Sequence, residues 1–238
     1  MTMTTNSQRP EILAIIPARG GSKGLPRKNV LPLARKPLIV HSIEQALAAR
    51  CVTRVVVSTD DPEIASVATG AKAEVVPRPA ELAGDTASSE SALLHALEYL
   101  RAQEGYQPEL LVFLQCTSPV RRPNDIDDAV AKLVATGADS LLSVSPFHGF
   151  LWSEEGGAAH ATNYDHRRRP RRQDRPPEFV ETGSIYVTKV AGLLESGNRL
   201  SGRIQLYPMP SWTAFDIDDL DDFRMCEALL ASKTPNGE

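Results

Sequence analysis

The chain has 238 residues, of which 42% are apolar, so it is long enough for one α/β domain with a complete hydrophobic core. Its 26 basic and 30 acidic residues give a formal net charge of −4, which argues against a bulk attraction to nucleic acid or to an anionic membrane. An anionic ligand must therefore be bound by a local cluster of cations.

Short apolar strands alternate with amphipathic helices through the first 144 residues. Such strands, separated by helices, predict a parallel sheet that is covered by helices on both faces. Thr59 or Asp60 is expected to cap the second helix. The predicted strands cover 11–17, 54–58, 74–76, 110–114 and 140–144, and the predicted helices cover 37–49, 62–68, 88–100 and 125–134.

The pattern breaks from residue 145 to 181, where Gly, Pro, Arg and isolated aromatic residues show no sustained period. We expect an arm or insertion over about 145–182, within a single domain that spans residues 1–238. Regularity returns with a strand over 183–188, a short helix and a strand over 204–207. An acidic run over 216–222 and an amphipathic helix end the chain.

Cysteine usage and hydropathy favour a cytoplasmic protein. Cys51, Cys116 and Cys226 are odd in number and contain no CxxC pair, which argues against disulfides and against a structural zinc site. No stretch approaches the length that spans a bilayer, so we expect a soluble protein without a membrane partner. Cys116 is expected to be a small buried residue and not a nucleophile, because no base is identifiable for it.

A glycine-rich basic loop, ARGGSKGLPRKN at 18–29, follows the first apolar strand. Its glycines let backbone N–H groups turn toward an anion, and it contains four cations. Open α/β sheets bind ligands at the carboxyl ends of their strands, so the loop predicts a triphosphate site; the alternative is a solvated basic turn. The loop lacks the GKS or GKT ending of a Walker A motif and the GxGxxG spacing, so neither an ATPase nor a dehydrogenase fits it.

A carboxylate pair near the C-terminus predicts a magnesium site. Asp216 and Asp218 alternate with Ile217, so an extended segment would point both carboxylates to one face while Ile217 enters the core. Mg²⁺ is commonly bound by one or two carboxylates together with phosphate and water oxygens. The remaining acidic residues of this run, Asp219, Asp221 and Asp222, are expected at the start of the last helix.

The loop resembles the signature of the N-acylneuraminate cytidylyltransferase (CMP-sialic acid synthetase) family. The resemblance implies a Rossmann-like, GT-A-like nucleotidyltransferase fold: a mostly parallel α/β sheet with helices on both faces and a protruding arm that forms a homodimer. It implies Mg²⁺-dependent transfer of CMP from CTP to an acidic acceptor such as a nonulosonic acid. The likeness continues in order through VSTD (57–60), RPAELAGDTASS (78–89), LQCTSP (114–119), RPRRQD (169–174), ETGSIY (181–186) and DIDDLDD (216–222).

The resemblance also implies roles for individual residues. Arg19 and Lys28 would hold the CTP phosphates, and Lys28 would stabilise the charge that develops on the α-phosphoryl and pyrophosphate groups. The implied catalytic residues are Lys28, Arg19, Asp216 and Asp218, of which the two aspartates bind the metal. The implied CTP-binding residues are Ala18, Arg19, Gly20, Gly21, Ser22, Lys23, Lys28, Asn29, Arg78, Asp85, Ala87 and Ser89. The implied acceptor-binding residues are Gln115, Arg172, Thr182 and Tyr186.

Three of these residues have alternative interpretations. Arg78 could be a surface cation before a proline, Tyr186 a core residue with a satisfied hydroxyl, and Arg172 part of a dimer seam. The acceptor half also departs from the family pattern, because Thr182 stands where asparagine is usual and 198–200 lacks an aromatic pair that some members have. A small phosphonate such as phosphonoformate is therefore an alternative acceptor.

Other functional classes remain as alternatives. A sugar nucleotidyltransferase that uses UTP or GTP would keep the same chemistry with a different base. A nucleotide-binding regulator without turnover has no need of the metal carboxylates. An RNA-binding protein could use the six arginines between Arg167 and Arg175, but the net charge is acidic and aromatic residues are not interleaved with them, so we expect no nucleic-acid partner.

Overall fold

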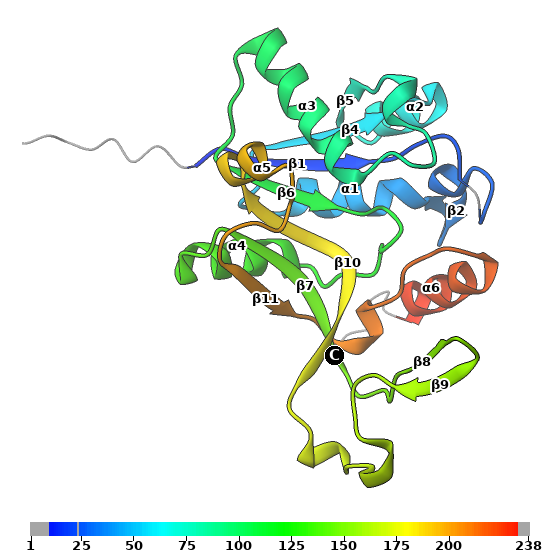
Figure 1. Cartoon of the computed structure of the whole chain (residues 1–238). Helices are drawn as coiled ribbons and strands as arrows, with labels where there is room; N and C mark the ends of the chain where they lie inside the picture. Colours follow the sequence, from blue (N-terminus) through cyan, green and yellow to red (C-terminus); the bar gives the residue numbers. More distant parts are fainter. Residues whose placement is uncertain (1–9, 23, 233–238) are drawn as a thin grey trace, which may run out of the picture.

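The computed structural model describes residues 10–22 and 24–232. They form a seven-stranded sheet of order β11-β7-β10-β6-β1-β4-β5, with helices packed on it (Figure 1). No described helix has the length and apolar character needed to cross a membrane. Lys23 lies outside the described residues, so its implied role in CTP binding stays a prediction.

The first part of the chain has the predicted alternation of strands and helices. The core strands β1, β4 and β6 are parallel neighbours and are almost entirely buried, as strands covered on both faces must be. The elements are β1 (Ile12–Pro17), α1 (Leu38–Ala48), β4 (Arg54–Thr59), α2 (Pro62–Gly70), β5 (Glu74–Pro77), α3 (Ser89–Glu104), β6 (Leu110–Leu114), α4 (Asp125–Thr136) and β7 (Ser140–Phe147).

The second part makes the sheet mixed. Strand β10 (Glu178–Lys189) is antiparallel to both β6 and β7, and its register with β7 shifts between Glu181 and Tyr186. It is longer than the predicted strand over 183–188, because its first residues pair with the end of β7 beyond the compact core. A short helix, α5 (Val190–Ser196), then leads to β11 (Ile204–Pro208), which is parallel to β7.

Apolar side chains fill both faces of the sheet. One core cluster contains residues of α1, α2 and α4, and a second contains residues of α3 and α5. A third cluster lies under α6 (Leu220–Ser232), where Leu33, Ile217 and Phe223 are buried together. The small hairpin formed by β2 (Pro32–Leu33) and β3 (Lys36–Pro37) was not predicted.

The cap of α2 differs from the prediction. Asp61, and not Thr59 or Asp60, accepts hydrogen bonds from the backbone N–H groups of Glu63 and Ile64, each at 2.9 Å. The side chain of Asp60 instead accepts from the backbone N–H of Gly20 at 3.2 Å. The end of β4 therefore contacts the glycine-rich loop.

The expected arm leaves the sheet between β7 and β10 (Figure 1). Its ends are strand, because β7 continues to Phe147 and β10 begins at Glu178. It contains the hairpin of β8 (Trp152–Glu155) and β9 (Ala158–Ala161). The guanidinium groups of Arg169 and Arg175 lie 4.3 and 4.7 Å from the centre of the Phe150 ring, so an aromatic residue from outside the arginine-rich stretch packs against it.

Candidate active site

A cavity of about 280 Å³ opens at the carboxyl end of β1. The loop after β1 forms one wall of it and ends in a short 3₁₀ helix, η1 (Lys28–Val30). Other walls come from the C-terminal end of β6 and from the acidic run at 216–222, which we call the acidic segment. The residues singled out from the sequence that line it are Ala18, Arg19, Ser22, Lys28, Asn29, Ser89, Gln115 and Asp218.

A second cavity of about 200 Å³ adjoins the first, because Pro17, Arg19 and Ser89 line both. Arg78, Asp85 and Ala87 also line this second cavity. The implied CTP-binding residues of the glycine-rich loop and those of the 78–89 segment therefore line two adjoining cavities. We call the two cavities together the cleft.

Lys28 joins the loop to the acidic segment. Its ammonium group donates to the backbone carbonyl of Ile217 and lies 3.4 Å from the Asp218 carboxylate, while its side chain is only 11% exposed. The two segments also touch at Gly24, where an added Cβ would lie 2.1 Å from the backbone oxygen of Asp218. Only glycine fits there without a shift of backbone, so the loop and the acidic segment are packed together.

The two aspartates have different surroundings. Asp216 accepts a hydrogen bond from the Ser118 hydroxyl at 3.2 Å, whereas the Asp218 side chain is 82% exposed and lines the cleft. Ile217 is fully buried between them, as predicted, and its N–H donates to the Thr117 carbonyl at 2.8 Å. The acidic segment is thus anchored to the end of β6.

The donor set fits a magnesium ion that completes its coordination with phosphate and water. The exposed carboxylate of Asp218 is available at the cleft, and oxygen ligands suit Mg²⁺. No group of three or more His, Cys, Asp or Glu side chains among the described residues has the geometry of a metal site.

The other acidic residues of the run cap α6. Asp219 accepts from the backbone N–H groups of Asp221 and Asp222, at 2.9 and 3.0 Å. Asp222 in turn accepts from the N–H groups of Asp218 and Asp219, at 3.0 and 3.2 Å. Their predicted place at the start of the last helix is confirmed.

Asn29 shapes the loop from inside. Its amide nitrogen donates to the carbonyl of Arg19 at 2.9 Å, and its amide oxygen accepts from the Cys116 thiol at 3.0 Å. Cys116 is buried, and burial raises the pKa of its thiol to about 11. The structure therefore supports the prediction that Cys116 is structural, because a nucleophilic cysteine needs an accessible thiolate.

Arg19 reaches from the loop to the 84–89 segment. It donates to the Gly84 carbonyl at 2.8 Å and lies 3.2 Å from the Asp85 carboxylate. Its side chain is 30% exposed in the cleft, so a bound anion can still reach the guanidinium. Arg19 therefore couples the loop to the segment that faces it.

Arg78 is not the surface cation that was one interpretation. Its side chain is 6% exposed, and the Asp60 carboxylate is 3.8 Å away. Nε and Nη2 of Arg78 have no hydrogen-bond partner among the described residues, and burial lowers the pKa of this guanidinium. Buried N–H groups without hydrogen-bond partners are costly, and Arg78 also lines the second cavity.

Gln115 lies at the end of β6 and lines the cleft. Gly183, with φ +69°, lies against it: an added Cβ would be 2.3 Å from the Gln115 amide oxygen. The close approach of the β10 bulge therefore restricts where the Gln115 side chain can lie.

Arg121 is a residue of this region that the sequence analysis missed. It is buried and donates to the side-chain oxygens of Ser42 and Gln45 and to the carbonyls of Gln115 and Ser184, at 2.7 to 2.9 Å. Desolvation lowers the pKa of this guanidinium to about 10. The arginine pair after the turn at 117–120 was the available signal, but sequence cannot tell which of its two side chains points inward.

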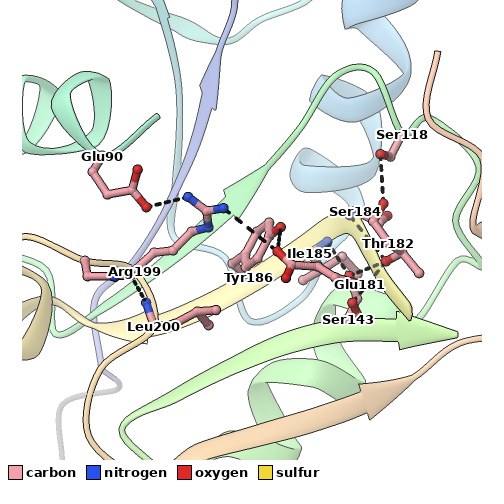
Figure 2. Close-up of polar contacts among 11 residues, drawn as sticks. Glu90, Ser118, Ser143, Glu181, Thr182, Ser184, Ile185, Tyr186, Arg199 and Leu200 are labelled. Atoms are coloured by element: carbon pink, nitrogen blue, oxygen red, sulfur yellow. Dashed lines mark hydrogen bonds and ion pairs between the residues drawn. The ribbon is translucent and has the colours of Figure 1, made fainter. Parts of the chain in front are cut away.

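Two of the implied acceptor-binding residues, Thr182 and Tyr186, make their side-chain contacts with other residues of the protein core. The Thr182 hydroxyl lies 2.7 Å from the Ser143 hydroxyl and is buried, so it faces β7 and not the cleft. Tyr186 stacks on Phe113 with ring centres 5.2 Å apart, and its hydroxyl donates to Glu181 (Figure 2). The interpretation of Tyr186 as a core residue with a satisfied hydroxyl is confirmed.

Arg172 lies on the arm. It belongs to a short 3₁₀ helix, η4 (Arg172–Asp174), and lines a separate cavity with Phe147 and His148. The structure does not bring Arg172 to the cleft of its own chain. The role of Arg172 in acceptor binding therefore stays a prediction.

The fold is that of known nucleotidyltransferases. A solved CMP:2-keto-3-deoxy-manno-octonic acid synthetase complexed with CTP matches with a TM-score of 0.71 and 20% identity, covering 94% of this chain and 99% of that one. A 4-diphosphocytidyl-2C-methyl-D-erythritol synthase matches with a TM-score of 0.69 and 14% identity, covering 94% and 100%. The predicted α/β fold class is confirmed.

Sequence comparison then identifies the family. The model of the family described as "Cytidylyltransferase" matches residues 13–168, and the chain belongs to this family of nucleotidyltransferases. N-acylneuraminate cytidylyltransferase A of Danio rerio is 38% identical over 217 residues, which are 88% of this chain and 49% of the relative. A pseudaminic acid cytidylyltransferase of Campylobacter jejuni is 31% identical over 223 residues, which are 91% and 95%. The chain spans about half the length of the fish relatives.

Proposed function

We propose that this chain is a Mg²⁺-dependent cytidylyltransferase that transfers CMP from CTP to a nonulosonic acid. One observation carries the proposal: Lys28 of the glycine-rich loop and Asp218 of the acidic segment meet in one cleft. A cation for phosphate and a carboxylate for a metal are thereby placed together. Family membership supports the reaction class, and the names of the relatives, which refer to N-acylneuraminate and pseudaminic acid, support the acceptor class.

In the proposed reaction, the acceptor hydroxyl oxygen forms a bond to the α-phosphorus of CTP. The bond from that phosphorus to the oxygen that bridges to the β-phosphate breaks, pyrophosphate leaves with the electron pair, and the hydroxyl proton passes to solvent. Lys28 holds positive charge where negative charge develops, which is the main contribution proteins make to this chemistry. Asp218 and Asp216 would hold a Mg²⁺ ion, which would supply further positive charge to the phosphates.

The nucleoside part of CTP is assigned to the second cavity. Arg78 lines this cavity, and Arg19 links the cavity to the loop. Because both cavities share Ser89, a nucleotide that spans them would contact the start of α3 as well as the loop.

We further propose a homodimer formed through the arm. The arm and the first part of β10 expose large apolar side chains, namely Leu151, Trp152, Phe179 and Val180. Because Arg172 lies away from the cleft of its own chain, it would contact the acceptor carboxylate in the cleft of a second copy. Gln115 would contact the same acceptor from within the chain.

A pyrophosphate-release assay tests the function. The protein is mixed with Mg²⁺, one of the four nucleoside triphosphates and one acid from a panel of sialic, legionaminic, octulosonic and small phosphonic acids. We expect release with CTP and a nonulosonic acid. Faster release with UTP or GTP would show that the enzyme prefers a different base. Release only with a phosphonate would show that the acceptor is a phosphonate and not a nonulosonic acid.

The same preparation separates the non-enzymatic alternatives. CTP binding without pyrophosphate release for any acid would indicate a regulator and contradict the proposed function. Tight, salt-sensitive RNA binding at physiological ionic strength would indicate the RNA-binding alternative. Omission of acceptor is the background control.

A further inference from the structure

The corner between β4 and α2 lies against the glycine-rich loop, although neither of its two aspartates lines the cleft. Asp60 accepts a hydrogen bond from the backbone N–H of Gly20 at 3.2 Å. The next residue, Asp61, lies beside the Cα of Gly20, where an added Cβ would be 2.6 Å from the Asp61 carboxylate. Gly20 therefore packs against two consecutive carboxylates.

Asp60 also contacts a residue of the second cavity. Its Oδ1 atom, which accepts from Gly20, lies 3.8 Å from Nη2 of Arg78. Arg78 lines the second cavity, and its backbone N–H donates to the Thr59 carbonyl at 2.8 Å. Burial lowers the pKa of the Arg78 guanidinium, and the charge of Asp60 acts against that shift. One carboxylate thus joins the loop of the first cavity to an arginine of the second.

The far end of the loop contacts the same corner. Arg27 forms an ion pair with Glu63, which lies in the first turn of α2, and between the two ends of the loop Ser22 and Gly24 line the first cavity. The side chains of Arg27 and Glu63 are both exposed, and exposed ion pairs contribute little to stability. Asp60, whose side chain is 27% exposed, is therefore the main polar anchor of the loop at this corner.

The charge of Asp60 has a direct and an indirect effect on an anionic ligand, and the two have opposite signs. A carboxylate close to a site for phosphates repels them, so its removal alone would strengthen the binding of CTP. A carboxylate that holds the cationic walls of the site in place favours binding, so its removal would weaken it. The direction of the change in affinity therefore distinguishes the two effects.

We propose that Asp60 is a positioning residue of the nucleotide site: by holding Gly20 and Arg78 together, it fixes the distance between the parts of the cleft that take the phosphates and the nucleoside. Asp60 touches no reacting atom and acts through these two residues. Preorganisation of this kind lowers the cost of binding, because the ligand need not order the site itself. The inference rests on the proposed function, in which CTP spans both cavities.

Two substitutions separate the oxygen of Asp60 from its charge. Asp60→Asn keeps an acceptor for Gly20 but removes the charge beside Arg78, whereas Asp60→Ala removes both. Pyrophosphate release gives the KM for CTP and for the nonulosonic acid, and titration calorimetry gives the Kd for CTP with Mg²⁺. For CTP, KM and Kd are expected to rise about threefold in Asp60→Asn and about tenfold in Asp60→Ala, while the KM for the acid stays within about twofold.

A double-mutant cycle with Arg78→Met tests the route through Arg78. In the Arg78→Met background, Asp60→Asn is expected no longer to raise the Kd for CTP, because the charge that it removes has no cationic partner left. Asp60→Ala is expected to raise this Kd still, because it also removes the acceptor of the Gly20 N–H. Such non-additivity is the mark of residues that act together.

Asp139→Ala is the matched control. Asp139 accepts from the backbone N–H of Arg203 at 2.8 Å, lies 2.8 Å from the Lys189 ammonium and occupies the space beside Gly202, so its contacts resemble those of the β4–α2 corner. It precedes β7 at the amino ends of the parallel strands, and the cleft lies at their carboxyl ends. The KM and Kd for CTP of Asp139→Ala are expected to equal those of the wild type.

Thermal unfolding of every variant checks the fold, and Asp60→Asn carries the test if Asp60→Ala does not fold. An unchanged or lower Kd for CTP in the folded Asp60 variants would overturn the inference, as would an equal rise in the KM values for CTP and for the acid. If the wild-type protein binds CTP but releases pyrophosphate with no acid, the proposed function fails while the calorimetric test of Asp60 still decides the inference. A wild-type protein that does not bind CTP would contradict both.

Discussion

The ammonium group of Lys28 lies 3.4 Å from the carboxylate of Asp218, although 190 positions separate these residues in the chain. The contact joins the loop after β1 to the segment before α6, and it places a buried cation beside an exposed carboxylate. A lysine held this way is preorganised, because its position does not depend on the bound nucleotide.

Lys28→Met is therefore expected to lower kcat by about 10²-fold or more, since it removes the charge that faces the reacting phosphates. The measurement is steady-state pyrophosphate release with CTP. Lys36→Met, which removes an exposed ion pair with Glu44, is the control and should keep near wild-type rates. A folded Lys28→Met protein within about threefold of the wild-type rate would exclude Lys28 from the mechanism.

Gly24→Ala is expected to nearly abolish activity without unfolding the protein. The new Cβ would meet the backbone oxygen of Asp218 at 2.1 Å, so the loop and the acidic segment must move apart. Gly70→Ala is the control, because nothing lies within 4 Å of its added Cβ. Activity and thermal unfolding are measured for both, and equal activities would show that the packing of these segments is dispensable.

Asp218→Asn and Asp216→Asn are expected to raise the Mg²⁺ concentration for half-maximal rate by about tenfold or more, because an amide is a weaker ligand for a hard cation than a carboxylate. The assay is a Mg²⁺ titration at fixed CTP, after treatment with EDTA. Asp221→Asn serves as the control, since its carboxylate is 3.2 Å from Arg224 on α6. An unchanged Mg²⁺ dependence in Asp218→Asn would remove that residue from the metal site.

The buried environment of His41 leads us to expect that the free energy of unfolding depends on pH. It is buried on α1, with Nε2 2.9 Å from the Leu33 carbonyl, and desolvation lowers the pKa of its imidazole. The hydrogen bond to the Leu33 carbonyl and the charge of Glu44 raise this pKa, whereas Lys36 and Arg121 lower it further. As pH falls below about 6.5, the unfolded chain takes up a proton that the folded chain resists, so stability decreases with falling pH.

Between pH 7.5 and 5.5, the free energy of unfolding of His41→Gln is expected to fall less than that of the wild type. Urea denaturation at several pH values measures the difference. His160→Gln, on the exposed β8–β9 hairpin, is the matched control. Parallel pH curves for wild type and His41→Gln would contradict the prediction.

The proposed homodimer predicts that a double variant, Phe179→Ser with Val180→Ser, is monomeric. Both side chains are exposed where β10 leaves the core toward the arm, and serine removes their apolar surface. Light scattering after size-exclusion chromatography measures the mass. Val134→Ser, an exposed apolar position on α4, should leave the mass unchanged. A wild-type protein that is monomeric at all concentrations would contradict the dimer.

Much of the fold could be predicted from local pattern. The strands at 12–17 and 110–114 are continuous apolar runs, and each is bounded by polar or turn residues, so their type and position were readable. The parallel direction of β1, β4, β5 and β6 was also predicted, from the helices between them, but the antiparallel direction of β10 was not, because its apolar run by itself looks the same in either direction. The antiparallel placement of β10 follows from how the arm returns the chain to the sheet.

The candidate site, like the fold, could be predicted from the sequence only in part. Residues 18–29 and the alternation of Asp216, Ile217 and Asp218 indicated a nucleotide and a metal from residue chemistry alone, because glycines, cations and carboxylates have few other uses in that order. Whether Thr182 faces a ligand or a neighbouring strand depends on the register and bulge of β10, which are long-range properties.

What the sequence by itself determined is the order of the elements, the phosphate-type loop and the membership of a nucleotidyltransferase family, since these depend on residues close together along the chain. Only the tertiary structure decided that Arg121 is buried beneath Gln115, that Arg78 is enclosed, and that Arg199 is shared between Glu90 and Glu181. The physical reason is that burial and pairing of a charge depend on which distant segments desolvate it, and that is set by packing across the sheet.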